Sequence, residues 1–379
     1  MSSDVVKPAD SRLGFSPQFS LSPEKNDTSS ALDLLRWGAS QAVCVGHAMA
    51  FFGVGDRWRP PSFPYIQNIG VLVFFVLSGF LIAHALVKQA SSPNGGLSVF
   101  VVERFPRIYT ALIPALLLIA LSDGLLILIG KHEHPTYFTY SAFLGTLGMF
   151  QNYSGPLRGA LAVPSFGSAG HLWSLAVEWH IYMFVGGIFF MLVNRKWLPA
   201  LLLALIFSSV PMQFFGTFTD GLHGSGLTYL WMLGFCTYFV ARTNVCCFMP
   251  KKVLLATAGA LIFIWILAIK PAEEYAPALY PLIAAAFLML TVFTQGTHAF
   301  RTKHKARNIA RKLADYSFSL YLVHYSLLYA LKILWVGNQV IAAVVGVILC
   351  NLIAWMFGNY IEWRHHNVAS YLKRIFGIG

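Results

Sequence analysis

Charged residues are scarce in this 379-residue chain. Only 11% of its residues are Asp, Glu, Lys or Arg, whereas 57% are hydrophobic, and the mean hydropathy is +0.63. An ordinary soluble domain carries about 25% charged residues, so most side chains here must face lipid or one another. The composition excludes a soluble enzyme or binding module and predicts a polytopic membrane protein.

Several motifs of soluble enzymes are also missing. The sequence has no Gly-rich phosphate loop, no Gly-x-Ser-x-Gly motif, no nucleotide fingerprint and no internal repeat. Its five cysteines lack the paired spacing of a zinc site or a disulfide framework. Lys and Arg outnumber Asp and Glu by 27 to 15, an excess that membrane topology explains better than nucleic-acid binding. We therefore expect no nucleic-acid partner, no metal and no bound cofactor.

Long apolar runs are present instead, and they fill the chain after residue 30. Residues 1–30 are polar and rich in Ser and Pro, which predicts a flexible cytoplasmic tail. The membrane domain is expected over 31–361, followed by a cytoplasmic tail at 362–379. Runs near 20 residues can cross a hydrocarbon core of about 30 Å. Eleven apolar segments are predicted: 31–53, 66–87, 108–130, 137–152, 171–193, 198–215, 226–241, 252–270, 276–295, 313–334 and 338–361.

The fourth segment, 137–152, differs from the others. It is short and contains Gly145, Gly148 and several polar residues, so we expect it to be re-entrant or interfacial. Ten crossings remain. With the N-terminus inside, most Lys and Arg residues fall on the cytoplasmic side, as the positive-inside rule predicts. The predicted fold is an all-α transmembrane bundle of about ten spans in the plasma (inner) membrane, with both termini cytoplasmic.

Two ionisable residues interrupt the first apolar segment. Arg36 and His47 are eleven residues apart, which at about 100° per residue brings both to nearly the same helical face. Ionisable groups inside a membrane are costly, about 2.5–3.5 kcal/mol each on insertion scales, so they indicate function. At 1.5 Å per residue, Arg36 lies roughly 5 Å and His47 roughly 20 Å from the cytoplasmic face. Both are candidate site residues.

The fifth segment carries a polar face at a matching depth. His171, Ser174 and Glu178 follow i, i+3 and i+7 spacing. This segment runs inward from the outer surface, so Glu178 reaches roughly the depth estimated for His47. A carboxylate beside an imidazole fixes its tautomer and stabilises it after proton uptake, as a general base requires. In the alternative interpretation, each group is a structural polar residue that bonds between helices.

Arg104 and Arg107 stand at the cytoplasmic start of the third segment, and Pro106 between them suits an early helical turn. Two planar guanidinium groups three residues apart can clamp phosphates. Cytoplasmic helix ends also carry arginine as topology anchors, and this alternative stays open. With Arg36 at a similar height, the pair predicts a cationic cluster beneath the path that leads to His47.

Together these motifs resemble the acyltransferase-3 family of integral membrane O-acyltransferases. The likeness extends in order over residues 31–361. It rests on five blocks of this sequence: 32–36 with His47, 74–82, 104–109, 171–178 and 315–324.

The resemblance implies transfer of an acyl group, often acetyl, from cytoplasmic acyl-CoA to a sugar hydroxyl of a glycan or glycolipid. It implies that His47 corresponds to the family's essential histidine and Arg36 to its partner in the first span. Arg104 and Arg107 correspond to the arginines implicated in handling the acyl donor.

Further polar residues are candidates for substrate binding or oxyanion stabilisation because they interrupt apolar spans. For one of them the alternative is helix packing, because Ser78 and Gly79 form a small pair suited to close approach. The candidates for substrate binding are His171, Ser174, Ser78, Tyr316, Tyr321 and His324.

The expected mechanism combines these groups. Arginines hold the coenzyme A phosphates, His47 removes the proton of the acceptor hydroxyl, and Glu178 orients the imidazole. A covalent acyl-histidine intermediate remains an alternative. The family commonly continues the fifth-span motif with a second acidic residue and Gln, whereas this chain has Trp179 and His180 after Glu178.

Two further alternatives concern the reaction as a whole. Some family members carry a fused extracytoplasmic domain, and this chain ends soon after its last predicted span, so we expect direct transfer or separate polysaccharide assembly proteins. A multi-pass transporter or flippase for a glycan or lipid is the alternative function.

Overall fold

The protein is a bundle of helices in a computed structural model that describes residues 21, 26–58, 60, 62–151, 161–193, 197–208, 226–243, 249–269, 275–295, 297 and 304–378. Within these ranges the regular elements are all helical, and strand-like pairing is limited to one bridge between Gln151 and Val163. The predicted all-α class is therefore confirmed. The other residues, including most of the expected N-terminal tail, lie outside the described part.

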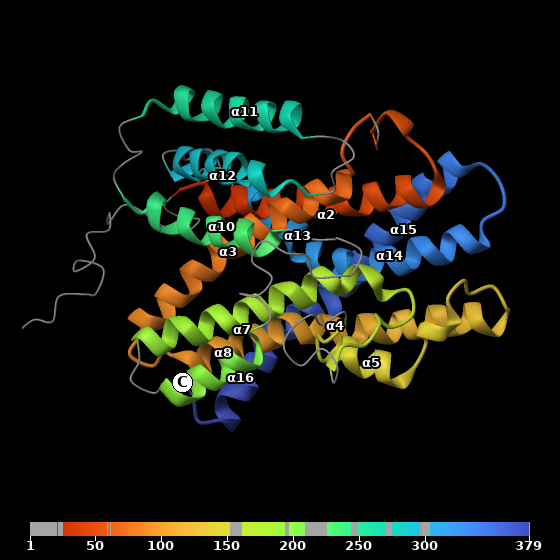
Figure 1. The fold of residues 1–379 in the computed structure, drawn as a ribbon, viewed down its shortest axis with the longest axis horizontal. Coiled ribbons are helices and arrows are strands. Elements are labelled where there is room, and N and C mark those ends of the chain that lie inside the picture. Colours follow the sequence, from red (N-terminus) through yellow and green to blue (C-terminus); the bar gives the residue numbers. More distant parts are fainter. Residues whose placement is uncertain are drawn as a thin grey trace, which may run out of the picture.

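Six long helices form the centre of the bundle. Figure 1 shows several of them side by side along the long axis of the molecule. Their apolar faces share one core, in which large side chains such as Phe80, Leu112 and Trp231 are fully buried. The six helices are α2 (Thr28–Phe52), α3 (Ile66–Ser91), α4 (Leu97–Leu128), α7 (Trp173–Val193), α14 (Ser317–Leu334) and α15 (Gln339–Tyr360).

Seven of the described helices are long and apolar enough to cross a membrane. They are α3, α4, α7, α14 and α15 together with α11 (Lys251–Ala268) and α12 (Tyr280–Gln295). Two apolar helices are shorter, α8 (Trp197–Ile206) and α10 (Leu227–Ala241). Helix α5 (Tyr140–Leu147) has eight residues, too few to cross, as expected for the fourth segment. The count of ten crossings stays a prediction.

Three helix boundaries differ from the expected ones. Helix α4 begins at Leu97, so Pro106 lies inside the helix and not in its first turn. The apolar residues ahead of Arg104 explain this, because Val99, Phe100 and Val102 are buried and extend the packed face. The segment expected over 313–334 is broken in two, α13 (His304–Asp315) and α14, with Tyr316 between them.

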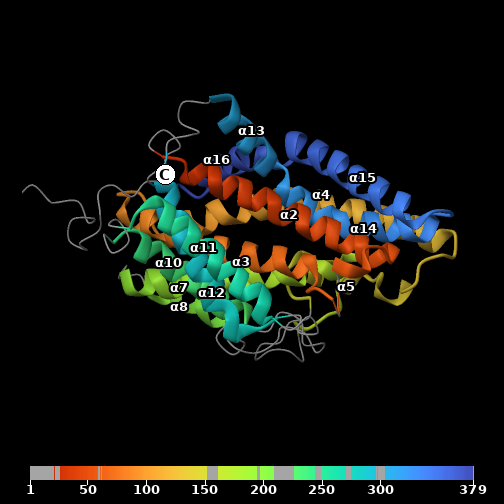
Figure 2. The ribbon, with the colours of Figure 1, turned by 90° about the horizontal axis from the view of Figure 1, so that it is seen from above.

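The third difference lies at the C-terminus, where 362–379 was expected to be a tail. Residues Glu362–Arg364 form the 3-10 helix η6, and α16 (His365–Ile375) follows it. Lys373 in α16 forms a 2.8 Å ion pair with Glu103 of α4. Figure 2 shows α16 toward the end of the bundle where α2 begins, with α5 toward the other end.

Helices α3 and α10 cross at two facing glycines. A Cβ atom at Gly79 would lie 2.0 Å from the backbone oxygen of Trp231, and one at Gly234 would lie 2.1 Å from that of Val76. Only hydrogen fits at either position. The close approach expected at the Ser78–Gly79 pair is thus confirmed, and it places Ser78 beside α10.

Candidate active site

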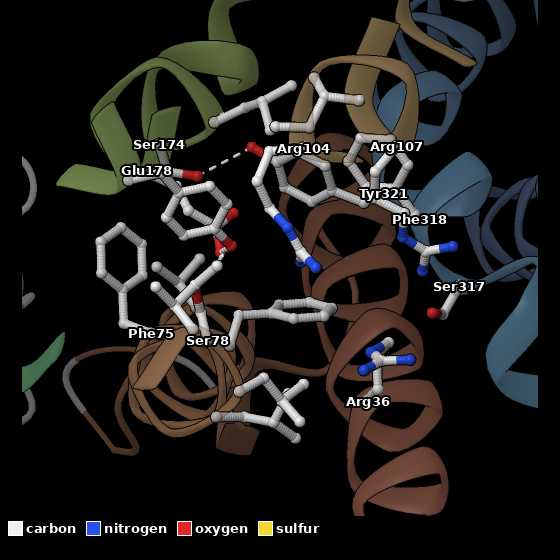
Figure 3. A pocket seen from close by; sticks show the side chains of 18 residues that line it. Arg36, Phe75, Ser78, Arg104, Arg107, Ser174, Glu178, Ser317, Phe318 and Tyr321 are labelled. Carbon is white, nitrogen blue, oxygen red and sulfur yellow. Dashed lines mark hydrogen bonds between the residues drawn. The ribbon is translucent and has the colours of Figure 1, made fainter. Parts of the chain in front are cut away.

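A cavity of about 140 Å³ opens among the central helices (Figure 3). The labelled arginine side chains lie toward one side of the view, and Glu178, Ser174 and Ser78 lie toward the other. Residues far apart in the sequence thus meet around one space. The polar lining consists of Arg36 from α2, Ser78 from α3, Arg104 and Arg107 from α4, Ser174, Glu178 and Tyr182 from α7, and Ser317 and Tyr321 from α14.

The three predicted arginines line this cavity, but their pairing differs. Arg36 lies 3.6 Å from Asp33, one helical turn away, and Arg107 lies 3.6 Å from Glu362. Arg104 forms no ion pair or hydrogen bond with any described residue, and its Nε atom is buried. A buried N–H of a guanidinium group without a partner is costly, and an anionic ligand would satisfy it. The cavity therefore suits an anion.

Glu178 is the acidic residue of the described lining, and its partners lie on α7 and α3. The Tyr182 hydroxyl donates to the Glu178 carboxylate. The Tyr182 oxygen also lies 2.7 Å from Ser78 Oγ, which accepts a 3.1 Å hydrogen bond from Trp231 Nε1. This network holds the carboxylate on the cavity wall opposite the arginines. Tyr182 lies four residues after Glu178, so i, i+4 spacing could have indicated the contact.

His47 lies in a different cluster. Its ring centroid is 5.3 Å from that of His324 and 5.0 Å from that of Tyr325, and His171 contacts both of these rings. His47 does not belong to the cavity lining that the described residues form. The expectation that His47 and the arginines line one common passage is therefore not met in this structure.

The expected contact between Glu178 and His47 is also corrected. In the described part of the chain, Glu178 bonds with Tyr182, whereas His47 makes only ring contacts. The two residues were paired by estimated depth alone. Depth fixes one coordinate of three, and it does not determine which helices are neighbours.

Tyr321 connects the cavity with the histidine cluster. It lines the cavity, and its hydroxyl donates a 2.7 Å hydrogen bond to the backbone oxygen of His171. Ser174 Oγ lies 2.8 Å from the same hydroxyl. The Tyr321 ring is 6.1 Å from that of His324, centroid to centroid. Tyr321 therefore forms the wall between the arginines and the histidines.

A buried carboxylate fixes the segment in front of His171. Asp123 of α4 accepts the backbone N–H of Ser168 at 2.7 Å and the Ser168 hydroxyl at 2.8 Å. Ser168 Oγ also lies 2.7 Å from Ser326 Oγ of α14. These bonds hold the 3-10 helix η3 (Ala169–Leu172), which carries His171, between α4 and α14.

One predicted substrate-binding residue stands apart from both groups. The Tyr316 hydroxyl accepts from Trp37 Nε1 at 3.0 Å and donates to Asn351 Oδ1 at 3.3 Å, which joins the junction between α13 and α14 to α2 and α15. Tyr316 does not line the cavity formed by the described residues. Seven of the predicted residues thus line the cavity, and three form the histidine cluster.

Besides Tyr182 and Ser317 of the cavity lining, the structure adds Glu362 and Tyr325, which the sequence did not single out. Glu362 was assigned to the C-terminal tail, yet it is 2% exposed and accepts a 2.7 Å hydrogen bond from Ser319. Tyr325 packs against His47 and His171. Tyr325 directly follows His324 in the chain, but a helical pattern alone does not show which neighbouring rings it contacts.

Comparison with known proteins assigns the family. A model described as an acyltransferase domain matches residues 29–359, which is most of the chain. The chain belongs to the acyltransferase-3 family. The match includes all eleven predicted site residues, so the resemblance inferred from the five sequence blocks is confirmed. Solved structures gave no significant match.

Three known proteins are similar in sequence to this chain, and two of them are named as O-acetyl transferases. Peptidoglycan O-acetyltransferase OatA of Listeria monocytogenes is 28% identical over 293 residues, 69% of this chain and 44% of that protein. An O-acetyl transferase of Shigella phage Sf6 is 25% identical, over 47% of this chain and 51% of the relative. Nodulation protein 10 of Rhizobium leguminosarum bv. viciae is 27% identical, over 40% of this chain and 41% of that protein. The chain spans about half the length of the curated relatives it matches.

Proposed function

We propose that this protein is a membrane O-acyltransferase that moves an acyl group, acetyl in the first instance, from cytoplasmic acyl-CoA to a hydroxyl group of a glycan or glycolipid. The main support is Arg104, a half-buried residue whose buried Nε atom has no hydrogen-bond partner among the described residues, in a cavity that Arg36 and Arg107 also line. This arrangement suits the phosphates of coenzyme A. Family membership and O-acetyltransferase relatives support the transferred group.

The proposed reaction uses His47 as general base. The acceptor hydroxyl attacks the thioester carbonyl carbon while its proton passes to His47. The tetrahedral intermediate then collapses, the carbon–sulfur bond breaks, and the coenzyme A thiolate takes the proton from His47. Glu178 stays on the cavity wall, where its charge and its bond to Tyr182 set the position of the facing Arg104. The thioester must pass Tyr321 to reach the histidines.

The topology belongs to the same proposal. An integral membrane protein of this family fits the inner membrane, with its arginine cavity and both termini on the cytoplasmic side. The acceptor then approaches from the outer side, delivered directly or by separate polysaccharide assembly proteins. Thiol-reagent labelling of single cysteines introduced at Ser370 and Asn338 tests this orientation, because only the first should be protected from an impermeant reagent in intact cells.

The central test uses purified protein in nanodiscs with radiolabelled acetyl-CoA. The wild type should bind the donor and release coenzyme A when a sugar acceptor is added. His47→Ala should keep donor binding and lose release by at least about 100-fold, the low end of general-base contributions. Absence of both donor binding and turnover in the wild type, together with glycan movement across vesicles in both proteins, would establish the transporter alternative instead.

A further inference from the structure

Helix α13 contacts α2, and its buried side is a stripe of alanines. Ala310 and Ala314 are 1% and 2% exposed, and Ala306, one turn earlier, is half-buried. Residues with i, i+4 and i+8 spacing share one helical face, and alanine side chains allow close packing there. The opposite side of α13 is left to whatever surrounds the bundle.

That opposite side carries two lysines with an isoleucine between them. Lys305, Ile309 and Lys312 are all exposed, Ile309 by 49%, and their i, i+4 and i+7 spacing places them on one face. At 1.5 Å per residue the two lysines lie roughly 10 Å apart along the axis, so both flexible side chains can reach one phosphate group. Neither lysine forms an ion pair or hydrogen bond with another described residue. We call these three residues the outer face of α13.

The other charged residues of α13 act mainly on the bundle. Arg311 lies within electrostatic reach of the Asp33 carboxylate of α2, and so does Asp315, the acidic residue of the helix. Arg307 is half-buried. Asp315 forms no ion pair with Lys312, so the positive charges of the outer face remain available to a ligand.

Helix α13 also lies where the bundle meets the membrane surface. Tyr316 alone separates it from α14, which is long and apolar enough to cross a membrane. Figure 2 shows α13 and α16 toward the same end of the bundle. Trp363 of η6 and Tyr371 of α16 are 64% and 63% exposed at that end. Trp and Tyr concentrate at membrane–water interfaces, so these side chains indicate the level of the lipid headgroups.

An anionic phospholipid matches both features of the outer face. Basic clusters on an amphipathic helix beside a membrane span attract anionic headgroups. Ile309 gains from contact with acyl chains, while the lysine stems lie along the apolar surface and their ammonium groups reach the phosphate. A free phosphate would satisfy the lysines but leave Ile309 in water. Topology requires basic residues on the cytoplasmic side, but it does not require an apolar residue between them.

We infer that Lys305, Ile309 and Lys312 form a binding surface for the headgroup of an anionic phospholipid. The two ammonium groups contact the phosphate, and Ile309 contacts the first carbons of the acyl chains. None of the three residues belongs to the lining of the arginine cavity that the described residues form. The lipid surface therefore does not depend on the proposed transfer reaction.

Photo-crosslinking from the neighbouring position tests this surface directly. Asn308 is exposed and precedes Ile309, so p-benzoylphenylalanine in place of Asn308 reports the lipids beside the outer face. In nanodiscs with equal amounts of phosphatidylglycerol and phosphatidylcholine, the crosslinked peptide should carry at least about fivefold more phosphatidylglycerol, the effect of one basic residue near an anionic surface. The ratio should fall to about unity in Lys305→Gln/Lys312→Gln.

The matched control is Lys251→Gln/Lys252→Gln, which removes the same charge from the start of α11. Both lysines are exposed, and Figure 1 shows α11 beginning at the end of the bundle where α2 begins. Adjacent helical residues point about 100° apart, so these two do not form one face. The lipid ratio at position 308 should stay as in the wild type. An equal fall in both double variants would show attraction by net charge alone and would overturn the inference.

A binding measurement separates the lipid from a soluble phosphate. In native mass spectrometry of detergent-solubilised protein, phosphatidylglycerol should bind the wild type about 25-fold more tightly than Lys305→Gln/Lys312→Gln, about fivefold for each lysine. Glycerophosphoglycerol, the same headgroup without acyl chains, should not compete. Competition by this compound, equal affinity of the two proteins, or equal crosslinking of both lipids in the wild type would overturn the inference. Failure of the wild type to bind acetyl-CoA would overturn only the proposed function.

Discussion

The hydroxyl group of Tyr321 donates a 2.7 Å hydrogen bond to the backbone oxygen of His171, and this bond joins the two halves of the candidate site. Tyr321 lines the cavity that holds the arginines, whereas His171 belongs to the histidine cluster. Ser174 Oγ, 2.8 Å from the same hydroxyl, completes the contact. Tyr321 therefore stands between the arginines of the cavity and the histidine cluster.

Tyr321→Phe should weaken this wall without changing the cavity's charge. Loss of the hydroxyl leaves the His171 carbonyl and the Ser174 hydroxyl without their partner, so the free energy of unfolding should fall by about 1–3 kcal/mol. Thermal unfolding in detergent measures that loss. The KM for methyl α-glucoside should rise while the Kd for coenzyme A stays within about twofold.

Tyr316→Phe is the comparison for this variant, because it removes a hydroxyl with two described partners that does not line the cavity. It should lower stability by a similar amount and leave the acceptor KM unchanged. An equal rise of KM in both variants would show that the effect of Tyr321→Phe is general destabilisation.

Arg104→Ala should weaken donor binding more than any other single arginine change in the cavity. Arg104 forms no ion pair or hydrogen bond with a described carboxylate, and its buried Nε atom has no hydrogen-bond partner, so it is better placed to bind a ligand than Arg36 or Arg107, which are already paired. Charge-assisted hydrogen bonds contribute roughly 1.5–3 kcal/mol, which predicts about a tenfold to hundredfold rise in the Kd of coenzyme A. Isothermal titration of protein in nanodiscs measures this.

Arg107→Ala should have a smaller effect in the same titration, because Arg107 is already paired with Glu362 at 3.6 Å. Lys312→Ala on α13 is the control for loss of a positive charge, because Lys312 is exposed and does not line the cavity. Equal Kd values for wild type, Arg104→Ala and Arg107→Ala would remove both arginines from the donor site.

Glu362→Gln should strengthen donor binding. The glutamate competes with phosphate for Arg107, while an amide at this position keeps an oxygen for the 2.7 Å hydrogen bond from Ser319. Because Arg107 is partly exposed, the pair contributes at most about 1 kcal/mol, which predicts a few-fold lower Kd and a steeper dependence on salt. Weaker binding would mean that Glu362 holds Arg107 in its binding position.

Gly79→Ala should destabilise the bundle. The new Cβ would lie 2.0 Å from the backbone oxygen of Trp231, so α3 and α10 must separate. Overpacking of this kind costs about 1–3 kcal/mol, measurable as a lower unfolding temperature. Gly259→Ala on α11 meets no atom within 4 Å and should be neutral or slightly stabilising, since alanine favours helix by about 1 kcal/mol. Unchanged stability of Gly79→Ala would contradict the close crossing.

Much of the bundle follows from local pattern. The last apolar segment, expected over 338–361, is α15 from Gln339 to Tyr360. Its ends could be predicted because Asn338 is a strong N-cap and accepts from two backbone N–H groups at the start of the helix. By contrast, the start of α4 at Leu97 could not be predicted from the sequence. Proline is common in the first turn of a helix, so Pro106 suggests a start near residue 106, and only the buried contacts of the residues before it show that the helix begins earlier.

The composition of the site was also predictable in part. Arg36, Arg104 and Arg107 were expected to lie together because they have a similar height near the cytoplasmic face and charged side chains avoid lipid. The structure brings them to one cavity. The partner of Glu178 was not predictable. Depth along a helix follows from counting residues, but lateral position depends on how the helices pack.

The sequence by itself determined that this chain lies in a membrane as a helical bundle, since too few charges remain to cover a soluble surface. It also indicated which rare ionisable side chains are candidate functional residues. Only the tertiary structure decided that Tyr321 divides arginines from histidines, and that the carbonyl groups of Leu320, Tyr321 and Leu322 set two imidazole tautomers. The contacts of His171 with Leu322 and Tyr321 join segments about 150 residues apart along the chain, which no local pattern encodes, whereas the carbonyls that bond His324 lie three and four residues before it in the same helix.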